Sequence, residues 1–124
     1  MYLSIIIPVF NEKDNIGILV KEIYDKLHNI KFEIIIVDDN STDGTIEVLK
    51  NLEKNYRDLR FIVRENLRRD LSKSCQVGFE NSKYENILVM DGDLQHDPAY
   101  IPQMMNELNK NNCDIVIGAR DLFT

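Results

Sequence analysis

The chain has 124 residues, of which 44% are hydrophobic, and this size suits one domain with a buried core. Its formal net charge of −6 would repel a phosphate backbone, so binding to DNA or RNA is not expected. No apolar run approaches the roughly 18 residues of a membrane-spanning helix, and residues 1–9 lack the basic start of a signal peptide. We therefore expect a single cytoplasmic domain over residues 1–124.

Short apolar runs alternate along the chain with segments in which apolar residues recur at helical spacing. The runs predict strands at residues 3–9, 32–37, 60–64, 86–90 and 114–118. The segments between them predict helices at residues 15–27, 46–52, 72–83 and 98–110. We expect the 86–90 strand to be buried, and Cys75, Val77 and Phe79 to point partly inward. The alternation predicts an α/β fold with a mainly parallel open sheet and flanking helices.

Polar loops leave the carboxyl ends of these predicted strands. In a parallel sheet these ends lie along one edge, where ligands bind in open α/β folds. The loops carry Asn11, Glu12, Asp38, Asp39, Asp91, Asp93 and residues 118–120. Several carboxylates on one edge repel each other unless a cation or hydrogen-bond donors balance them. A site assembled from these loops follows.

Asp91 and Asp93 stand one residue apart where the 86–90 strand ends. Hard oxygen ligands of this kind suit Mg²⁺ or Mn²⁺, with the phosphates of a nucleotide completing the coordination. A helix cap is the alternative for any single aspartate, and we favour it for Asp43 and Asp97, which precede predicted helices. Asp14 is a plausible cap of the helix predicted at residues 15–27. A cap explains neither the pair nor its strand-end position.

Two features leave alternatives open. His96 either orients a phosphate or sugar hydroxyl, or is a hydrogen-bonded neighbour of the acids. The segment at residues 65–71 carries two arginines, Arg68 and Arg69, followed by Asp70. This segment is either a solvated surface loop or a contact for phosphate groups.

Four motifs occur in order along the chain: Pro8-Val9-Phe10-Asn11-Glu12, residues 37–45 around Asp38-Asp39, residues 91–98 beginning Asp91-Gly92-Asp93, and Gly118-Ala119-Arg120. In this order and spacing they resemble the family 2 glycosyltransferases of the GT-A fold. The resemblance is closest to the dolichyl-phosphate or polyprenyl-phosphate mannosyl- and glucosyltransferases. It covers nearly the whole chain.

The resemblance implies a role for each matching position. It implies a nucleotide-binding set of Pro8, Phe10, Glu12, Asp38, Asp39, Asp91, Arg68 and Arg69. Pro8, Phe10 and Glu12 would line the base pocket, where the Asp39 carboxylate would accept from the N–H groups of uracil or guanine. Asp91 and Asp93 would be the catalytic residues because they hold the cation and the ribose, with Gln95 as a further metal ligand.

The implied reaction is an inverting transfer of a hexose from a nucleotide sugar, GDP-mannose or UDP-glucose, with Mg²⁺ or Mn²⁺. The acceptor would be a polyprenyl or dolichyl phosphate, which places the protein at the cytoplasmic face of a membrane. Family members usually continue for roughly a hundred residues past the segment that matches Gly118-Ala119-Arg120, beyond a domain of this size. The resemblance therefore implies a truncated domain that lacks its acceptor side, with an exposed face through which it could self-associate.

Three other classes compete with this interpretation. A non-catalytic sugar-nucleotide-binding fragment or scaffold is the main alternative. A receiver-type signalling domain is disfavoured, because its acidic pair follows the first strand whereas Asp38 and Asp39 follow the second, and Arg120 stands where a lysine is expected. A dinucleotide-binding oxidoreductase is disfavoured, because no Gly-x-Gly-x-x-Gly follows any predicted strand.

Overall fold

A computed structural model describes residues 2–65 and 68–110. The described residues contain four parallel strands in the order β3-β2-β1-β4: β1 (Tyr2–Val9), β2 (Lys31–Asp38), β3 (Leu59–Val63) and β4 (Ile87–Val89). The helices are α1 (Ile16–Lys26), α2 (Thr45–Asn55), α3 (Leu71–Glu80) and α4 (Ile101–Lys110), with a short 3₁₀ turn η1 (Pro98–Tyr100) before α4. The predicted alternation and the parallel sheet are confirmed. The strand predicted at residues 114–118 lies outside the described residues.

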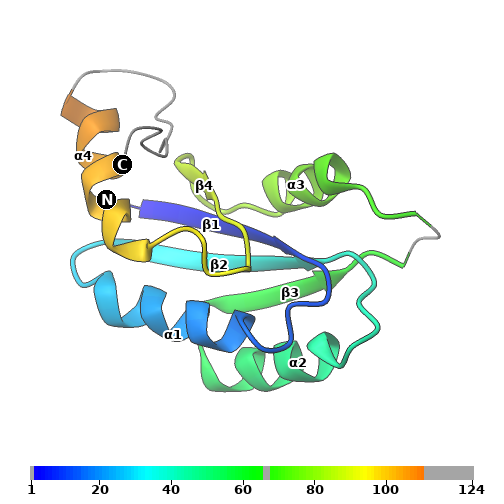
Figure 1. Cartoon of the computed structure of the whole chain (residues 1–124). Helices are drawn as coiled ribbons and strands as arrows, with labels where there is room; N and C mark the ends of the chain where they lie inside the picture. The colour runs from blue at the N-terminus through cyan, green and yellow to red at the C-terminus, as the bar shows by residue number, and fades with distance from the viewer. Residues whose placement is uncertain (1, 66–67, 111–124) are drawn as a thin grey trace, which may run out of the picture.

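Helices cover both faces of the sheet. Figure 1 shows α1 and α2 below the sheet and α3 above it. The central strands β1 and β2 are therefore buried on both sides, which is why each is apolar nearly throughout rather than alternating. None of the described helices is long and apolar enough to cross a bilayer.

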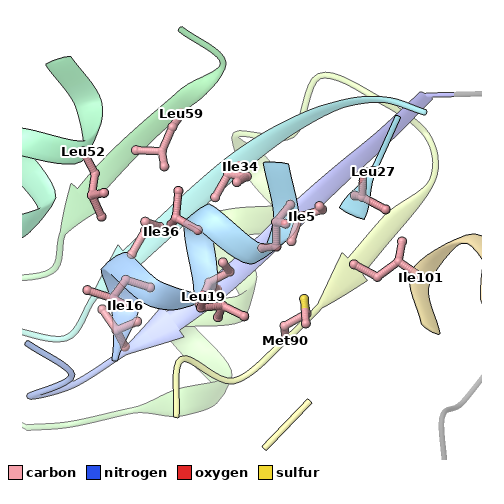
Figure 2. Packing of buried hydrophobic residues seen from close by; sticks show 14 of the residues in the cluster. Ile5, Ile16, Leu19, Leu27, Ile34, Ile36, Leu52, Leu59, Met90 and Ile101 are labelled. Atoms are coloured by element: carbon pink, nitrogen blue, oxygen red, sulfur yellow. The ribbon is translucent and has the colours of Figure 1, made fainter. Parts of the chain in front are cut away.

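The main core lies between the sheet and helices α1 and α2. Figure 2 shows Ile5 of β1 and Ile34 and Ile36 of β2 facing Ile16 and Leu19 of α1. The same cluster continues to Leu27, Met90 and Ile101, so α4 packs at the end of α1. The helical spacing of apolar residues in α1 thus forms one fully buried face.

On the other face, α3 packs against β1 and β2 through small residues. Ser74 and Gly78, one helical turn apart, are its buried positions. A Cβ atom added at Gly78 would lie 2.4 Å from Cγ2 of Ile6, so only glycine allows this approach. Phe79 is 48% exposed, so its predicted inward position is wrong. The residue that faces the sheet is its neighbour Gly78.

Strand β4 is less covered than we predicted. It has three residues, and Ile87 and Val89 are 41% and 39% exposed among the described residues. Backbone pairing with β1 holds β4 in the sheet. Ile6 lies opposite Val89, and the amide of Met90 donates to the carbonyl of Ile6 at 3.0 Å. The predicted full burial is therefore wrong for this strand, which is the end strand of the described sheet.

A buried carboxylate ties the amino-terminal end of the sheet together. Glu33 is 2% exposed and accepts from the Ser4 hydroxyl at 2.6 Å, the Lys83 amide at 2.6 Å and Arg60 at 2.5 Å. Burial alone would raise the pKa of Glu33, but these three donors outweigh it and the pKa lies below its ordinary value. Through Lys83 the network fixes the connection that leads from α3 into β4.

Replacing Glu33 by alanine is expected to lower the free energy of unfolding by about 2–3 kcal/mol, because buried donors lose their acceptor. Urea unfolding measures this loss. Since the pKa of Glu33 is lowered in the folded protein, its contribution is full above the ordinary value of 4.5 and is lost as the pH falls through the lower, folded-state pKa.

The matched control is Glu47→Ala, which removes an exposed carboxylate that pairs with Lys50 at 3.4 Å. Its cost should stay within about 0.5 kcal/mol. Equal losses at Glu33 and Glu47 would contradict the assigned network.

The strand order also separates the competing fold classes. Receiver domains have the order 2-1-3-4-5, whereas the order here matches the first four strands of the 3-2-1-4-5-6 doubly wound sheet. In that arrangement successive strands are added on one side of β1 up to β3, and β4 is then added on the other side of β1. Ligands bind outside the carboxyl ends of the strands at this point, where the strand order reverses. The receiver class is thus excluded by topology, and the site is expected beside the ends of β1 and β4.

Candidate functional site

The loops that follow β1 and β2 are held together by side-chain hydrogen bonds. The amide of Asn11 donates to the Ser41 hydroxyl at 2.8 Å, and the Asn11 side chain accepts from the Thr42 amide at 2.8 Å. The Glu12 amide donates to Thr45 at 3.1 Å. Asn11 has a φ of 53°, a left-handed conformation that asparagine tolerates better than most residues. These contacts make one rigid rim from the two loops.

Asp38 and Asp39 have different surroundings although they are adjacent. Asp38 is fully buried and accepts from the amide and the hydroxyl of Ser41 at 2.8 and 2.6 Å, so it shapes the loop. Asp39 is 7% exposed, accepts from Arg64 at 2.5 Å and accepts from the amide of Asp70 at 2.7 Å. Asp39 therefore connects the end of β2 to the segment that follows β3.

The guanidinium group of Arg69 lies over the ring of Phe10. The guanidinium carbon of Arg69 lies 4.3 Å from the centre of the Phe10 ring. Phe10 is partly exposed, Pro8 is buried, and Arg68 and Arg69 are exposed. The segment after β3 thus returns to the end of β1, as a phosphate or nucleotide contact requires. Whether it contacts phosphate stays a prediction.

The segment Asp91-Gly92-Asp93 lies against the end of β1. A Cβ atom at Gly92 would lie 2.8 Å from Cγ1 of Val9 and 3.5 Å from Cγ of Glu12, so glycine is required for this approach. Asp91 is exposed and Asp93 partly exposed, so both carboxylates are accessible. The structure therefore places the backbone between the two aspartates beside Val9 and Glu12, at the predicted position at the end of β1.

The loop after Asp93 is shaped by local hydrogen bonds. The Asp93 carboxylate accepts from the amide of Gln95 at 3.1 Å, and Leu94 between them has a φ of 67°. Leucine rarely adopts this left-handed conformation, and such strain concentrates at functional loops. Nδ1 of His96 accepts from the amide of Asp91 at 3.3 Å. His96 thus closes the loop, which favours the second of its two interpretations.

The structure tests the predicted helix caps. Asp97 accepts from the Ala99 amide at 2.9 Å and caps η1, and Asp43 accepts from the Thr45 amide at 3.0 Å at the start of α2. The cap at Asp97 is confirmed, whereas the predicted cap at Asp43 is wrong because Gly44 is the N-cap of α2 and Asp43 lies one residue before it. The bond from the Ala99 amide lowers the pKa of Asp97, and the bond from the Thr45 hydroxyl lowers the pKa of Asp43. Asp14 is not the cap of α1. Asn15 holds that position without a side-chain cap bond. The side-chain amide of Asn15 donates to the carboxylate of Glu12 at 3.0 Å.

The donor set at Asp91 and Asp93 fits a hard divalent cation. Both carboxylates are exposed or partly exposed, and Gln95 beside them offers an amide oxygen. Among residues 2–65 and 68–110, no three histidine, cysteine or acidic side chains converge as a complete metal cage. An Mg²⁺ site of one or two carboxylates plus substrate phosphates needs no such cage. The residues present therefore suit a cation that binds together with a nucleotide.

Arg64 is the site residue that we did not predict. The sequence places it at the end of a strand among other arginines, and only the fold shows that it reaches Asp39 of the neighbouring strand. Its position at a strand end, on the edge where the acids gather, was the available signal. Residues 118–120 of the fourth motif lie outside the described residues.

The strand order, the interlocked loops and the acidic pair define an open α/β domain with a candidate site at the strand ends, where folds of this kind bind nucleotides. The family model of Glycosyl transferase family 2 matches residues 4–124. The chain therefore belongs to glycosyl transferase family 2, and the resemblance of its motifs is confirmed.

Curated relatives agree with this assignment. The chain is 37% identical over 120 residues to a dolichol-phosphate mannosyltransferase of Pyrococcus furiosus. This match covers 97% of the chain and 33% of the relative. The chain is also 34% identical over 123 residues to a dodecaprenyl-phosphate galacturonate synthase of Rhizobium johnstonii. That match covers 95% of the chain and 36% of the relative. The chain thus spans about a third of the length of these relatives.

Solved structures confirm the GT-A fold. TarS of S. aureus, solved with UDP, has a TM-score of 0.76 and 21% identity and covers 90% of this chain and 33% of its own. The mannosyltransferase PcManGT of Pyrobaculum calidifontis, solved with GDP-Man and Mn²⁺, has a TM-score of 0.66 and 24% identity. That match covers 73% of this chain and 27% of the other.

Proposed function

We propose that this chain is the donor-binding part of an inverting glycosyltransferase that uses a nucleotide sugar, GDP-mannose or UDP-glucose. The observation that carries the proposal is the position of Asp91-Gly92-Asp93, packed against the end of β1 where ligands bind in this fold. Membership of the family supports the reaction class. The hexose would leave its diphosphate by displacement at the anomeric carbon.

Asp91 and Asp93 would hold Mg²⁺ or Mn²⁺, with Gln95 as a further oxygen ligand. The bound cation supplies charge stabilisation for the departing diphosphate. The exposed carboxylate pair supports this role, as does the presence of Mn²⁺ and GDP-Man in PcManGT. The strained Leu94 keeps Asp93 and Gln95 on one short turn.

The base would bind between the ends of β1 and β2. Phe10, Pro8 and Glu12 would line this pocket, and Asp39, supported by the buried Asp38, would accept from the base. Arg68 and Arg69 would approach the diphosphate or an acceptor phosphate, since guanidinium groups pair well with phosphate oxygens. The contact between Arg69 and Phe10 supports the nearness of the two groups.

The acceptor would be a polyprenyl or dolichyl phosphate at the cytoplasmic face of a membrane. The two lipid-phosphate enzymes among the relatives support this class of acceptor. A phosphate monoester is largely ionised at neutral pH, so it needs no general base to become a nucleophile. This fits a site in which no further carboxylate has to be assigned as a base.

A non-catalytic sugar-nucleotide-binding fragment or scaffold is the alternative. The two functions differ in transfer and not in donor binding. Incubation with the donor, Mn²⁺ and polyprenyl phosphate separates them. Formation of a glycosylated lipid supports the transferase, whereas donor binding without product supports the alternative.

Base recognition by Asp39 predicts a defined nucleotide preference. Uracil and guanine present a ring N–H to a carboxylate, whereas cytosine and adenine present a ring nitrogen lone pair at the matching position. With Mn²⁺ present, we expect UDP or GDP to raise the thermal midpoint and CDP and ADP to raise it much less. Differential scanning of the four complexes measures this. Equal shifts with all four bases would contradict the role of Asp39.

A further inference from the structure

We infer that Arg64 is the positioning residue for base recognition: it fixes the Asp39 carboxylate in the direction in which a nucleotide base meets it. The inference rests on the proposed function and adds to it a residue that need not touch the nucleotide. It begins from an ion pair that is unusually well buried. The side chains of Arg64 and Asp39 are 9% and 7% exposed, and Nη1 of Arg64 lies 2.5 Å from Oδ1 of Asp39.

The second oxygen of Asp39 is held as well. Oδ2 accepts from the amide of Asp70 at 2.7 Å, so each carboxylate oxygen has one fixed donor. A carboxylate oxygen can accept about two hydrogen bonds, which leaves one acceptor direction on each oxygen. With the carboxylate held at both oxygens, only a ligand that presents N–H groups along those directions is matched.

Arg64 also holds Asp70, whose amide is the second donor to Asp39. Nη1 of Arg64 lies 3.2 Å from the carbonyl oxygen of Asp70 and 3.5 Å from the hydroxyl of Ser74, which is buried in α3. Asp70 is the cap of α3, where its side chain accepts from the Lys73 amide at 3.1 Å. One guanidinium group therefore joins the end of β2 to the start of α3.

This joint has a consequence for specificity. A buried carboxylate that lost its arginine would have to rotate toward water or toward another donor, because a buried charge without its ionic partner is costly. Either change alters the acceptors that the base meets, but neither touches Asp91 and Asp93. Base preference and metal-dependent phosphate binding should therefore separate in Arg64 variants.

The sheet provides a matched control at its other end. Arg60 of β3 also pairs with a buried carboxylate of β2, Glu33, at the same 2.5 Å. That pair lies at the amino-terminal end of the sheet, away from the strand-end site. An ion pair that only stabilises the fold would behave alike at both positions.

The test compares Arg64→Gln, Arg64→Lys and Arg60→Gln by calorimetric titration with UDP, GDP, CDP and inorganic pyrophosphate in Mn²⁺. We expect Arg64→Gln to reduce the preference for the better of UDP and GDP over CDP by roughly 10-fold, with pyrophosphate affinity unchanged. Arg60→Gln should keep the wild-type preference even if it lowers stability. Arg64→Lys keeps the charge without the planar fork, so it should fold and still lose part of the preference.

Each result decides one claim. An unchanged base preference in both Arg64 variants overturns the inference, as does an equal loss in Arg60→Gln. If the wild-type chain itself shows no preference or no nucleotide binding, the proposed function fails, and the inference fails with it. Loss of preference confined to the Arg64 variants supports both.

Discussion

Asp93→Asn is expected to weaken Mn²⁺-dependent nucleotide binding at least about 100-fold, because it would remove a charged oxygen ligand of the cation. Even substitution of a residue that only hydrogen-bonds to a metal ligand typically lowers metal affinity about 10–100-fold. The substitution is nearly isosteric. Asparagine can still accept from the Gln95 amide, which the Asp93 carboxylate does at 3.1 Å. The local turn should therefore persist, and the loss measured by calorimetry reports the ligand role and not the fold.

Asp97→Asn is the matched control, since it lies in the same loop. Asp97 also accepts from an amide two residues later, that of Ala99 at 2.9 Å, and it pairs with Lys26 at 2.9 Å. We expect this variant to keep the nucleotide affinity and to lose less than about 1 kcal/mol of stability. Wild-type affinity in Asp93→Asn would refute the metal-ligand assignment, and an equal loss in Asp97→Asn would refute its specificity.

Gly78→Ala should be among the most destabilising single-methyl substitutions in the chain. The new Cβ would lie 2.4 Å from Cγ2 of Ile6 and 3.1 Å from two further atoms of that side chain. Ile6 is fully buried in β1, so α3 has to move away from the sheet or Ile6 has to leave its rotamer. We expect a loss of about 2–3 kcal/mol in urea unfolding, with a fall in the thermal midpoint of roughly 10 °C.

Gly17→Ala adds the same methyl group without the clash. Gly17 lies in α1, and an added Cβ there would meet nothing within 4 Å. Alanine is the better helix former, so this variant should gain up to about 0.5–1 kcal/mol. If the two alanine variants have the same stability, α3 does not pack on β1 as closely as described.

Sequence periodicity predicts the part of the fold that is decided by local pattern. Strands β1 and β2 and helices α1 and α2 were predicted well, because their apolar residues are numerous and their period is clear. The inner face of α3 was predicted only in part, since Cys75 and Val77 are partly buried but Phe79 is exposed. Its contact positions, Ser74 and Gly78, are small rather than apolar, so a hydrophobic pattern points to the wrong side of the helix. The exposure of β4 likewise depends on its neighbours in the sheet, which no local pattern encodes.

The candidate site divides in a similar way. The topology of a parallel sheet is enough to predict that the loops after β1, β2 and β4 meet, and the close approach of Gly92 to Val9 and Glu12 agrees with it. Sequence cannot separate Asp38 from Asp39, since burial and partners decide which carboxylate faces a ligand. Arg64 was missed for the same reason, because its partner lies 25 residues away in sequence.

The central claim is that the strand-end acids bind a nucleoside diphosphate through a divalent cation. Calorimetric titration of the wild-type chain with GDP and with UDP, first in Mn²⁺ and then with the metal removed by a chelator, tests it most directly. We predict saturable binding of at least one of the two in Mn²⁺ and its loss on chelation. Equal affinity with and without the metal, or no binding of either nucleotide, would contradict the claim.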